Sequence, residues 1–288
     1  MTLATTRDLV DHAVAGDRAV LAFNVITLEH AEAIATGIQH AGSSAILQVS
    51  ENAIVFHGGK LSPIIAACAK VAAEASVPIS VHLDHFQDLA LTERAIDMAA
   101  DLGVSSIMLD AAHLPYRRNV QQTRDLTRRA HAHGLWVEAE LGAIGGKDGA
   151  HSPGVRTSPP EASEFVAQTA VDGLAVAVGS SHAMTSPDAL IDLTLIAELA
   201  LVVPVPLVLH GSSGVADETL VAAIGAGIRK INVGTALNVA FTREVRRFLD
   251  QNLEVTDPRK YIREGSDSMA RTVTHLCRLV DAACVPAR

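Results

Sequence analysis

The feature that most constrains the fold of this chain is an eightfold alternation of a short apolar run with a longer helical pattern. Apolar runs of about 4–8 residues indicate buried strands, and longer segments with apolar residues three and four apart indicate amphipathic helices. The predicted strands are Ala19–Val25, Ala45–Val49, Ile79–Leu83, Ser105–Leu109, Trp136–Leu141, Leu174–Val178, Leu207–Leu209 and Lys230–Val233. The helices between and after them are expected at Leu28–Ala41, from Ser62-Pro63 onward, and at Asp88–Leu102, Arg117–His133, Pro160–Thr169, Asp188–Leu201, Asp217–Ala226 and Thr235–Leu253.

Eight strand-then-helix units are what a (β/α)₈ TIM barrel requires, whereas an open doubly wound sheet usually has fewer strands. We therefore predict an α/β fold with the barrel at about 19–253. Because no linker or low-complexity segment interrupts the alternation, residues 1–288 are expected to form a single domain. A C-terminal tail at about 254–288 is expected to carry a last helix near Ser268–Ala283.

Composition and charge narrow the functions open to the chain. The sequence is 49% hydrophobic and only 3% aromatic, which suits buried parallel strands under amphipathic helices. Its net charge of −9 argues against nucleic-acid binding, which needs a basic face, but backbone amides can still hold a small phosphorylated substrate. No segment approaches the ~20 apolar residues of a membrane span, and three cysteines without metal-like spacing indicate a reducing compartment. We expect a cytoplasmic protein without nucleic-acid or membrane partners.

Three predicted strands run into a histidine. His85 follows the third strand, His182 follows the sixth by a few residues, and His210 ends the seventh. In a TIM barrel the loops after the strands form one face, where active sites lie. Three imidazoles that converge there, with room for water or substrate, would form an open, catalytic Zn²⁺ site.

Carboxylates also end strands at this face. Asp84 alternates with aliphatic residues of the third strand, so it should point into the barrel and could exchange a proton with a ligand beside the metal. Asp110 and Glu140 could orient the histidines or hold a second divalent ion. We expect His82 to be a hydrogen-bonded interior residue, and Glu138 to form a surface salt bridge more readily than Glu140.

The loops after strands seven and eight are typical of a phosphate site. Gly211-Ser212-Ser213-Gly214 and Asn232-Val233-Gly234-Thr235 each supply backbone amides just before a helix. Unpaired N–H groups and the positive end of the helix favour anions there. Together with the histidines, they indicate a phosphorylated substrate bound next to a metal.

These motifs resemble the class II, metal-dependent ketose-bisphosphate aldolases, which include the fructose-bisphosphate and tagatose-bisphosphate aldolases. The resemblance runs along nearly the whole chain. The segments that carry it are Ala22-Phe23-Asn24-Val25, His82-Leu83-Asp84-His85, Ser105–Asp110, Glu138-Ala139-Glu140-Leu141-Gly142 with Gly145-Gly146, Leu209–Gly214, Lys230–Thr235 and Asp257-Pro258-Arg259.

The resemblance implies one catalytic Zn²⁺ per subunit, bound by His85, His182 and His210, with Asp84 as the acid/base at the aldehyde oxygen. Asp110 and Glu140 match positions tied to a second or alternative metal site. A monovalent cation near the phosphate is also a property of family members, and the subunits are expected to form a dimer or tetramer. The residues that would bind the phosphate and the rest of the substrate are Asn24, Ala183, Gly211, Ser212, Ser213, Asn232, Val233, Gly234 and Thr235.

The implied reaction is the reversible cleavage of a ketose 1,6-bisphosphate into dihydroxyacetone phosphate and a phosphorylated aldehyde. Zn²⁺ polarises the carbonyl and spreads the charge of the ene-diolate left by proton removal. A lysine Schiff base is the competing route. Among the five lysines only Lys230 falls in a barrel strand, and we expect it to start the eighth strand at the far face, which argues against that route.

Two residues depart from the family pattern, both in loops. The family carries a glutamate base shortly after the Gly-Gly pair, where this chain has Lys147-Asp148, so Asp148 is the expected substitute, one methylene shorter. This loop belongs to the long irregular stretch Gly142–Pro159, and loops of more than ~12–15 residues are usually functional or mobile. After His182 the family usually has glycine, and Ala183 adds a methyl group there.

Substrate choice stays open in the sequence. Arg263 lies where some fructose-bisphosphate enzymes bind the second phosphate, although a solvated tail arginine explains it equally well. No motif distinguishes fructose from tagatose bisphosphate. The alternatives are an aldolase for another phosphorylated keto-sugar, a sugar-phosphate-binding barrel with impaired catalysis, and a metal-dependent hydrolase. Hydrolase barrels usually carry a His-x-His pair on the first strand, and this chain has none there, which argues against the hydrolase.

Overall fold

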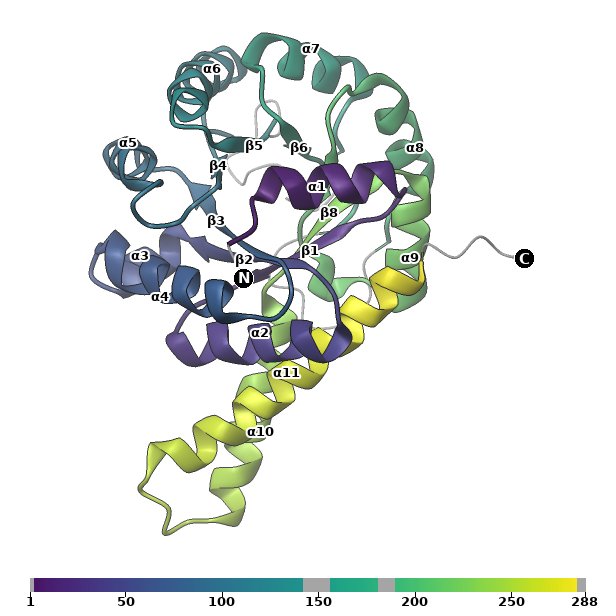
Figure 1. Ribbon diagram of the computed structural model, residues 1–288. Helices are drawn as coiled ribbons and strands as arrows, with labels where there is room; N and C mark the ends of the chain where they lie inside the picture. The colour runs from purple at the N-terminus through teal and green to yellow at the C-terminus, as the bar shows by residue number, and fades with distance from the viewer. Residues whose placement is uncertain (1–2, 142–155, 181–189, 284–288) are drawn as a thin grey trace.

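The computed structural model describes residues 3–141, 156–180 and 190–283. Within them, eight parallel strands close into a barrel in chain order, and β8 pairs with β1 (Figure 1). The strands are β1 (Val20–Asn24), β2 (Ala45–Ser50), β3 (Ile79–Phe86), β4 (Ser106–Leu109), β5 (Trp136–Glu140), β6 (Gly173–Ala175), β7 (Leu207–Leu209) and β8 (Ile228–Val233). The predicted TIM barrel is confirmed.

Helices surround the barrel, and most have the bounds expected from their apolar spacing. They are α1 (Thr6–Ala15), α2 (Leu28–Ala41), α3 (Glu51–Phe56), α4 (Leu61–Glu74), α5 (Leu89–Met98), α6 (Tyr116–Ala132), α7 (Pro159–Thr169), α8 (Leu193–Val202), α9 (Asp217–Ala226), α10 (Thr235–Gln251) and α11 (Pro258–Ala282), with a 3₁₀ turn, η1, at Ser212–Gly214. Side chains cap several of them: Asp88 accepts from the Leu91 amide and Asp192 from the Leu195 amide. No described helix is both long and apolar enough to cross a membrane.

Helix α1 was not predicted, because it precedes the first strand and so lies outside the strand-helix alternation. It crosses the end of the barrel where the strands begin (Figure 1). Its apolar residues Leu9 and Val10 pack with Trp136 from inside the barrel. The Thr6 hydroxyl lies 2.9 Å from that of Ser80 and 2.6 Å from that of Ser106. Helix α1 therefore closes the end of the barrel opposite to the predicted site.

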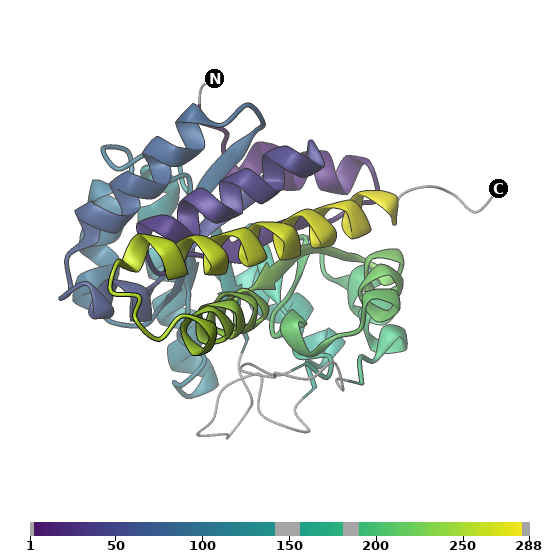
Figure 2. The same ribbon diagram turned by 90° about the horizontal axis from the view of Figure 1, so that it is seen from below.

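The C-terminal helix is longer than predicted. It begins at Pro258 instead of Ser268, because Asp257 caps it by accepting from the Arg259 amide at 3.1 Å and the proline suits a first helical turn. Figure 2 shows α11 lying along α2, with α10 beside it. In Figure 1 the end of α10 and the start of α11 project beyond the barrel.

Alternation along the strands divides the core in two. Outward side chains such as Phe23, Val81 and Leu83 are fully buried in one cluster with the helices. Inward side chains near α1 include the apolar Val20, Ile46 and Trp136 together with Ser80 and Ser106, whereas Gln48 and Asp84 lie inside the barrel toward the other end. Because buried polar groups are costly unless they are paired, the buried Gln48 and Asp84 at the end opposite α1 indicate a candidate site there.

Candidate active site

Asp84 and His85 line one cavity although they are consecutive in a strand. In a regular strand their side chains would point to opposite faces. The register between β3 and β4 shifts between Leu83 and Phe86, and His85 has the left-handed φ of 51°. This bulge turns His85 toward the side of Asp84, and bulges and positive φ at non-glycine residues are common at functional sites.

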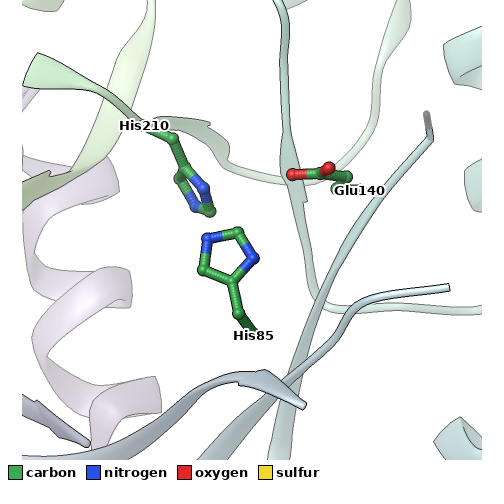
Figure 3. A group of neighbouring side chains, drawn as sticks. All are labelled: His85, Glu140 and His210. Carbon is green, nitrogen blue, oxygen red and sulfur yellow. The ribbon is translucent and has the colours of Figure 1, made fainter. Parts of the chain in front are cut away.

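His85, Glu140 and His210 form the group of described residues best suited to hold a metal ion. One ligand atom from each lies within 4.8 Å of the others, and the three side chains face a common centre (Figure 3). The rings of His85 and His210 are 4.9 Å apart, edge to face. Two imidazole nitrogens and a carboxylate oxygen are a donor set that Zn²⁺ accepts, so the residues fit a divalent cation. His182, the third predicted ligand, lies outside the described residues.

The charges around His85 favour a cation at this position. Burial lowers the pKa of its imidazole, but Asp84, the hydrogen bond with Asp110 and the charge of Glu140 outweigh burial and raise that pKa to about 10. Burial in turn raises the pKa of Asp110, and its contacts with His85 and Gln87 outweigh this and hold that pKa well below its usual range. The Asp110 carboxylate lies 3.0 Å from the His85 ring, so it can orient the ring.

The cavity next to these residues has a volume of about 220 Å³ and opens at the carboxyl ends of the strands. It joins Asp84 and His85 to the two predicted anion loops. Its lining consists of Asn24, Val25, Ile26, Gln48, Ser50, Asp84, His85, Gly211, Ser213, Asn232, Gly234, Thr235 and Asn238. The cavity thus connects the Asp84 carboxylate, one side chain of the candidate metal group and two loops that precede helices.

A hydrogen-bond chain holds Asp84 at the cavity wall. Gln48 donates to Asn24 at 2.9 Å, and Asn24 donates to Oδ2 of Asp84 at 2.8 Å. The other oxygen, Oδ1, is buried and has no hydrogen-bond partner among the residues that the structure describes. A buried carboxylate oxygen without a partner suggests a ligand contact at that atom.

The anion loops are tied to each other and to a helix end. Gly211 adopts φ 66° before η1, and Gly234 precedes the first turn of α10. The Ser213 hydroxyl accepts from the Ala236 amide at 2.9 Å, so one loop caps the helix that follows the other. Open N–H groups and the positive helix end at Gly234 and Thr235 favour an anion in the cavity.

Behind the cavity, four side chains form a closed ring of contacts, hereafter the buried ring: His210, Glu138, Lys230 and Asn232. Glu138 lies 2.9 Å from His210 and 2.8 Å from Lys230, and Lys230 donates to Asn232 at 2.6 Å. Asn232 closes the ring 2.9 Å from His210. The expectation of a surface salt bridge for Glu138 is therefore wrong, because its side chain is fully buried.

The position predicted for Lys230 is also wrong. It was expected at the far face, but β8 begins at Ile228 and the lysine side chain is 0% exposed inside the barrel. Both errors have one cause: helices cover the outer face of each strand and other strands' side chains fill the inner one, so both faces are buried. A charged residue in such a strand is therefore not distinguished by the sequence pattern as inward or outward. The Lys230 ammonium is engaged by Glu138 and Asn232.

Other predicted residues lie apart from the cavity or outside the description. The Ser212 hydroxyl donates to the Asn232 carbonyl at 2.6 Å, and Val233 packs in the outer core. Arg263 is exposed on α11 and does not line the cavity. Asp148 and Ala183 lie outside the described residues.

Five lining residues were missed: Val25, Ile26, Gln48, Ser50 and Asn238. A signal existed for Gln48, which is the only polar residue in the apolar run Ala45–Val49.

Comparisons with known proteins agree with this geometry. The sequence model of the family described as fructose-bisphosphate aldolase class-II matches residues 4–283. Among similar solved structures, the YdjI aldolase from Escherichia coli K12 has 28% identity and a TM-score of 0.83, with 97% of each chain covered. A putative fructose-1,6-biphosphate aldolase from Coccidioides immitis has 30% identity and a TM-score of 0.83, with 96% of each chain covered. Fructose-bisphosphate aldolase (Fba) from Campylobacter jejuni, at 22% identity and a TM-score of 0.82 over 97% of this chain and 96% of that one, shares the fold.

Proposed function

Because the chain belongs to the class II fructose-bisphosphate aldolase family, we propose that it cleaves a ketose 1,6-bisphosphate reversibly into dihydroxyacetone phosphate and a phosphorylated aldehyde. The observation that carries the proposal is the cavity that joins Asp84 and His85 to the loops at Gly211 and Gly234. Aldol cleavage of a phosphorylated ketose needs a group that moves a proton near the breaking bond and an anion pocket a few ångströms away. The cavity supplies both.

His85, His182 and His210 are proposed as the metal ligands. Glu140 lies in the same group as His85 and His210, which supports its assignment to the metal centre as a further or alternative ligand, with Asp110 behind His85. Zn²⁺ bound there would act as a Lewis acid that polarises the substrate carbonyl and stabilises the negative charge that develops on it.

The chain's own residues then position the substrate and move protons. The amides before α10 and around Gly211 would hold the phosphate of dihydroxyacetone phosphate, with Asn232 as a side-chain donor. Asp84, oriented by Asn24, would exchange a proton with the aldehyde oxygen through its buried Oδ1. Asp148 is proposed as the base that takes the proton from the carbon next to the carbonyl.

The proposal also includes Arg263, the assembly of subunits and a monovalent cation. Arg263 would contact the second phosphate only by reaching a neighbouring subunit's cavity, since it does not line its own, so a homo-oligomer is part of that assignment. A monovalent cation beside the phosphate and a cytoplasmic role in sugar-phosphate breakdown follow the family pattern.

A coupled cleavage assay on fructose and tagatose 1,6-bisphosphates, with zinc content measured on the same sample, tests the proposal. We expect turnover of one of the two substrates by protein that carries zinc. Zinc-loaded protein that turns over neither substrate would contradict the ketose-bisphosphate assignment.

A further inference from the structure

We propose that Glu138 and Lys230 are positioning residues: through the buried ring they keep the proton of His210 on Nε2, so that Nδ1 is the nitrogen presented to a metal ion. The inference rests on the proposed metal centre. It adds a role for two residues that touch neither the substrate nor the metal.

The first step is the orientation of Asn232. A lysine ammonium only donates hydrogen bonds, and Lys230 Nζ lies 2.6 Å from the end of the Asn232 side chain. That end is therefore the amide oxygen. The Asn232 NH₂ group consequently faces Nε2 of His210, at 2.9 Å.

The second step is the competition at Nε2 of His210. This nitrogen lies 2.9 Å from the Asn232 NH₂ and 2.9 Å from Glu138 Oε1. If Nε2 carries the proton, it donates to a carboxylate; if it does not, its lone pair accepts from the amide and opposes the carboxylate oxygen. Hydrogen bonds to an ionised acceptor are roughly twice as strong as neutral ones, so Nε2 keeps the proton and Nδ1 keeps a lone pair.

The third step is the role of Lys230. Its ammonium lies 2.8 Å from Glu138 Oε2, and both side chains are 0% exposed. Without this partner the buried carboxylate would lack its compensating charge. Lys230 thus contacts both groups that face His210, the Glu138 carboxylate and the Asn232 side-chain amide. Because Asn232 lines the cavity, the ring connects the metal side of the site with the anion side.

The substitution Glu138→Gln gives a specific expectation. Lys230 can only donate, so it would turn the new amide oxygen toward itself and the new NH₂ toward His210. Nε2 would then face two donors and could only accept, which moves the proton to Nδ1. A proton on Nδ1 competes with the metal, and loss of a partner behind a ligand typically costs 10–100-fold in metal affinity.

The experiment reads the tautomer directly. The ¹⁵N-labelled histidine rings of metal-free protein are observed by NMR, with His210 assigned from the signals lost in His210→Gln, and zinc affinity is measured by competition with a chromophoric chelator. In the native chain we expect the His210 proton on Nε2. In Glu138→Gln we expect it on Nδ1, with zinc affinity lower by about 10–100-fold.

The matched control is Ser106→Ala, which removes other hydrogen bonds inside the barrel, those to His82 at 2.8 Å and to Thr6 at 2.6 Å. It should leave the His210 tautomer and the zinc affinity unchanged. If Glu138→Gln does not fold, Glu138→Met removes the acceptor of His210 while Lys230 still donates to Asn232. Nε2 then faces only the Asn232 NH₂ group, so loss of a pure Nε2–H signal is again expected.

A pure Nε2–H signal in the folded variant, or zinc affinity within twofold of the native chain, would overturn the inference. A merely structural role of the ring would lower the unfolding midpoint without moving the proton, which also contradicts it. Failure of the proposed aldol cleavage would appear separately, as an inactive native protein whose His210 tautomer and zinc affinity still respond to Glu138.

Discussion

Raising the pH should destabilise the metal-free protein through His85. Its imidazolium is stabilised in the folded state, where its pKa is raised from 6.5 to about 10. A group with a raised folded pKa contributes stability that is complete below pH 6.5 and is lost as the pH rises through about 10. The loss should therefore fall within this window.

The size of the effect follows from the shift and from the exposure of the ring. At 1.36 kcal/mol per pKa unit the ceiling is about 5 kcal/mol. The His85 side chain is 23% exposed beside an open cavity, so solvent screening reduces this, and we expect ~2 kcal/mol. With an unfolding entropy of ~2.1 cal/mol/K per residue, that corresponds to a decrease of roughly 3 °C in the melting temperature.

Other groups also titrate in this window, so the assay compares the chain with His85→Gln, whose amide can still donate to Asp110. Melting temperatures of both EDTA-treated proteins are measured from pH 6.5 to pH 10. Without metal, we expect the difference in unfolding free energy between the native chain and His85→Gln to decrease by ~2 kcal/mol across the window. With zinc present we expect no such decrease, because the metal replaces the proton on His85. A difference that is independent of pH without metal would refute the electrostatic reasoning.

Three further perturbations test other parts of the site. His210→Ala should lose bound zinc and keep its circular dichroism. The control His275→Ala, at an exposed ring paired with Asp217, should keep its zinc. A full zinc equivalent in His210→Ala would contradict the assignment of His210 as a metal ligand. Gly234→Ala would place a Cβ 2.9 Å from the Asn24 amide oxygen, so Asn24 should move and lose its hydrogen bond to Asp84. Turnover should then fall roughly tenfold, which is ~1.4 kcal/mol in the barrier, while the zinc content stays unchanged. An unchanged rate would contradict the role of Asn24. Asp148→Ala should lower turnover by about 10²–10⁴-fold without loss of zinc, and an unaffected rate removes Asp148 as the base.

The barrel and part of the site were predictable because they rest on periodicity. Each apolar run became a strand, and residues that end strands of a TIM barrel must meet at one rim. His85, Glu140 and His210 were found in this way, and they do come together. Helix α1 and the early start of α11 lie outside the repeated units, so the same periodicity gave no signal for them.

The rest depended on facts that a linear pattern does not contain. The bulge at His85 needs a left-handed backbone at a non-glycine residue. No glycine or other turn residue in the sequence around His85 predicts it. Glu138 and Lys230 meet because β5 and β8, which are not neighbours in the sheet, both turn these side chains into the closed barrel. Their charges, read along the chain, look like surface charges until the closed barrel shows that both side chains point inward.

The dependence of aldol cleavage on added zinc tests the proposed metal centre most directly. Protein stripped with a chelator is titrated with Zn²⁺, and cleavage of the preferred ketose bisphosphate is measured at each addition. We expect negligible cleavage without metal and a linear rise that ends at one equivalent of zinc per subunit. Cleavage that persists after the metal has been removed would contradict the proposed metal centre.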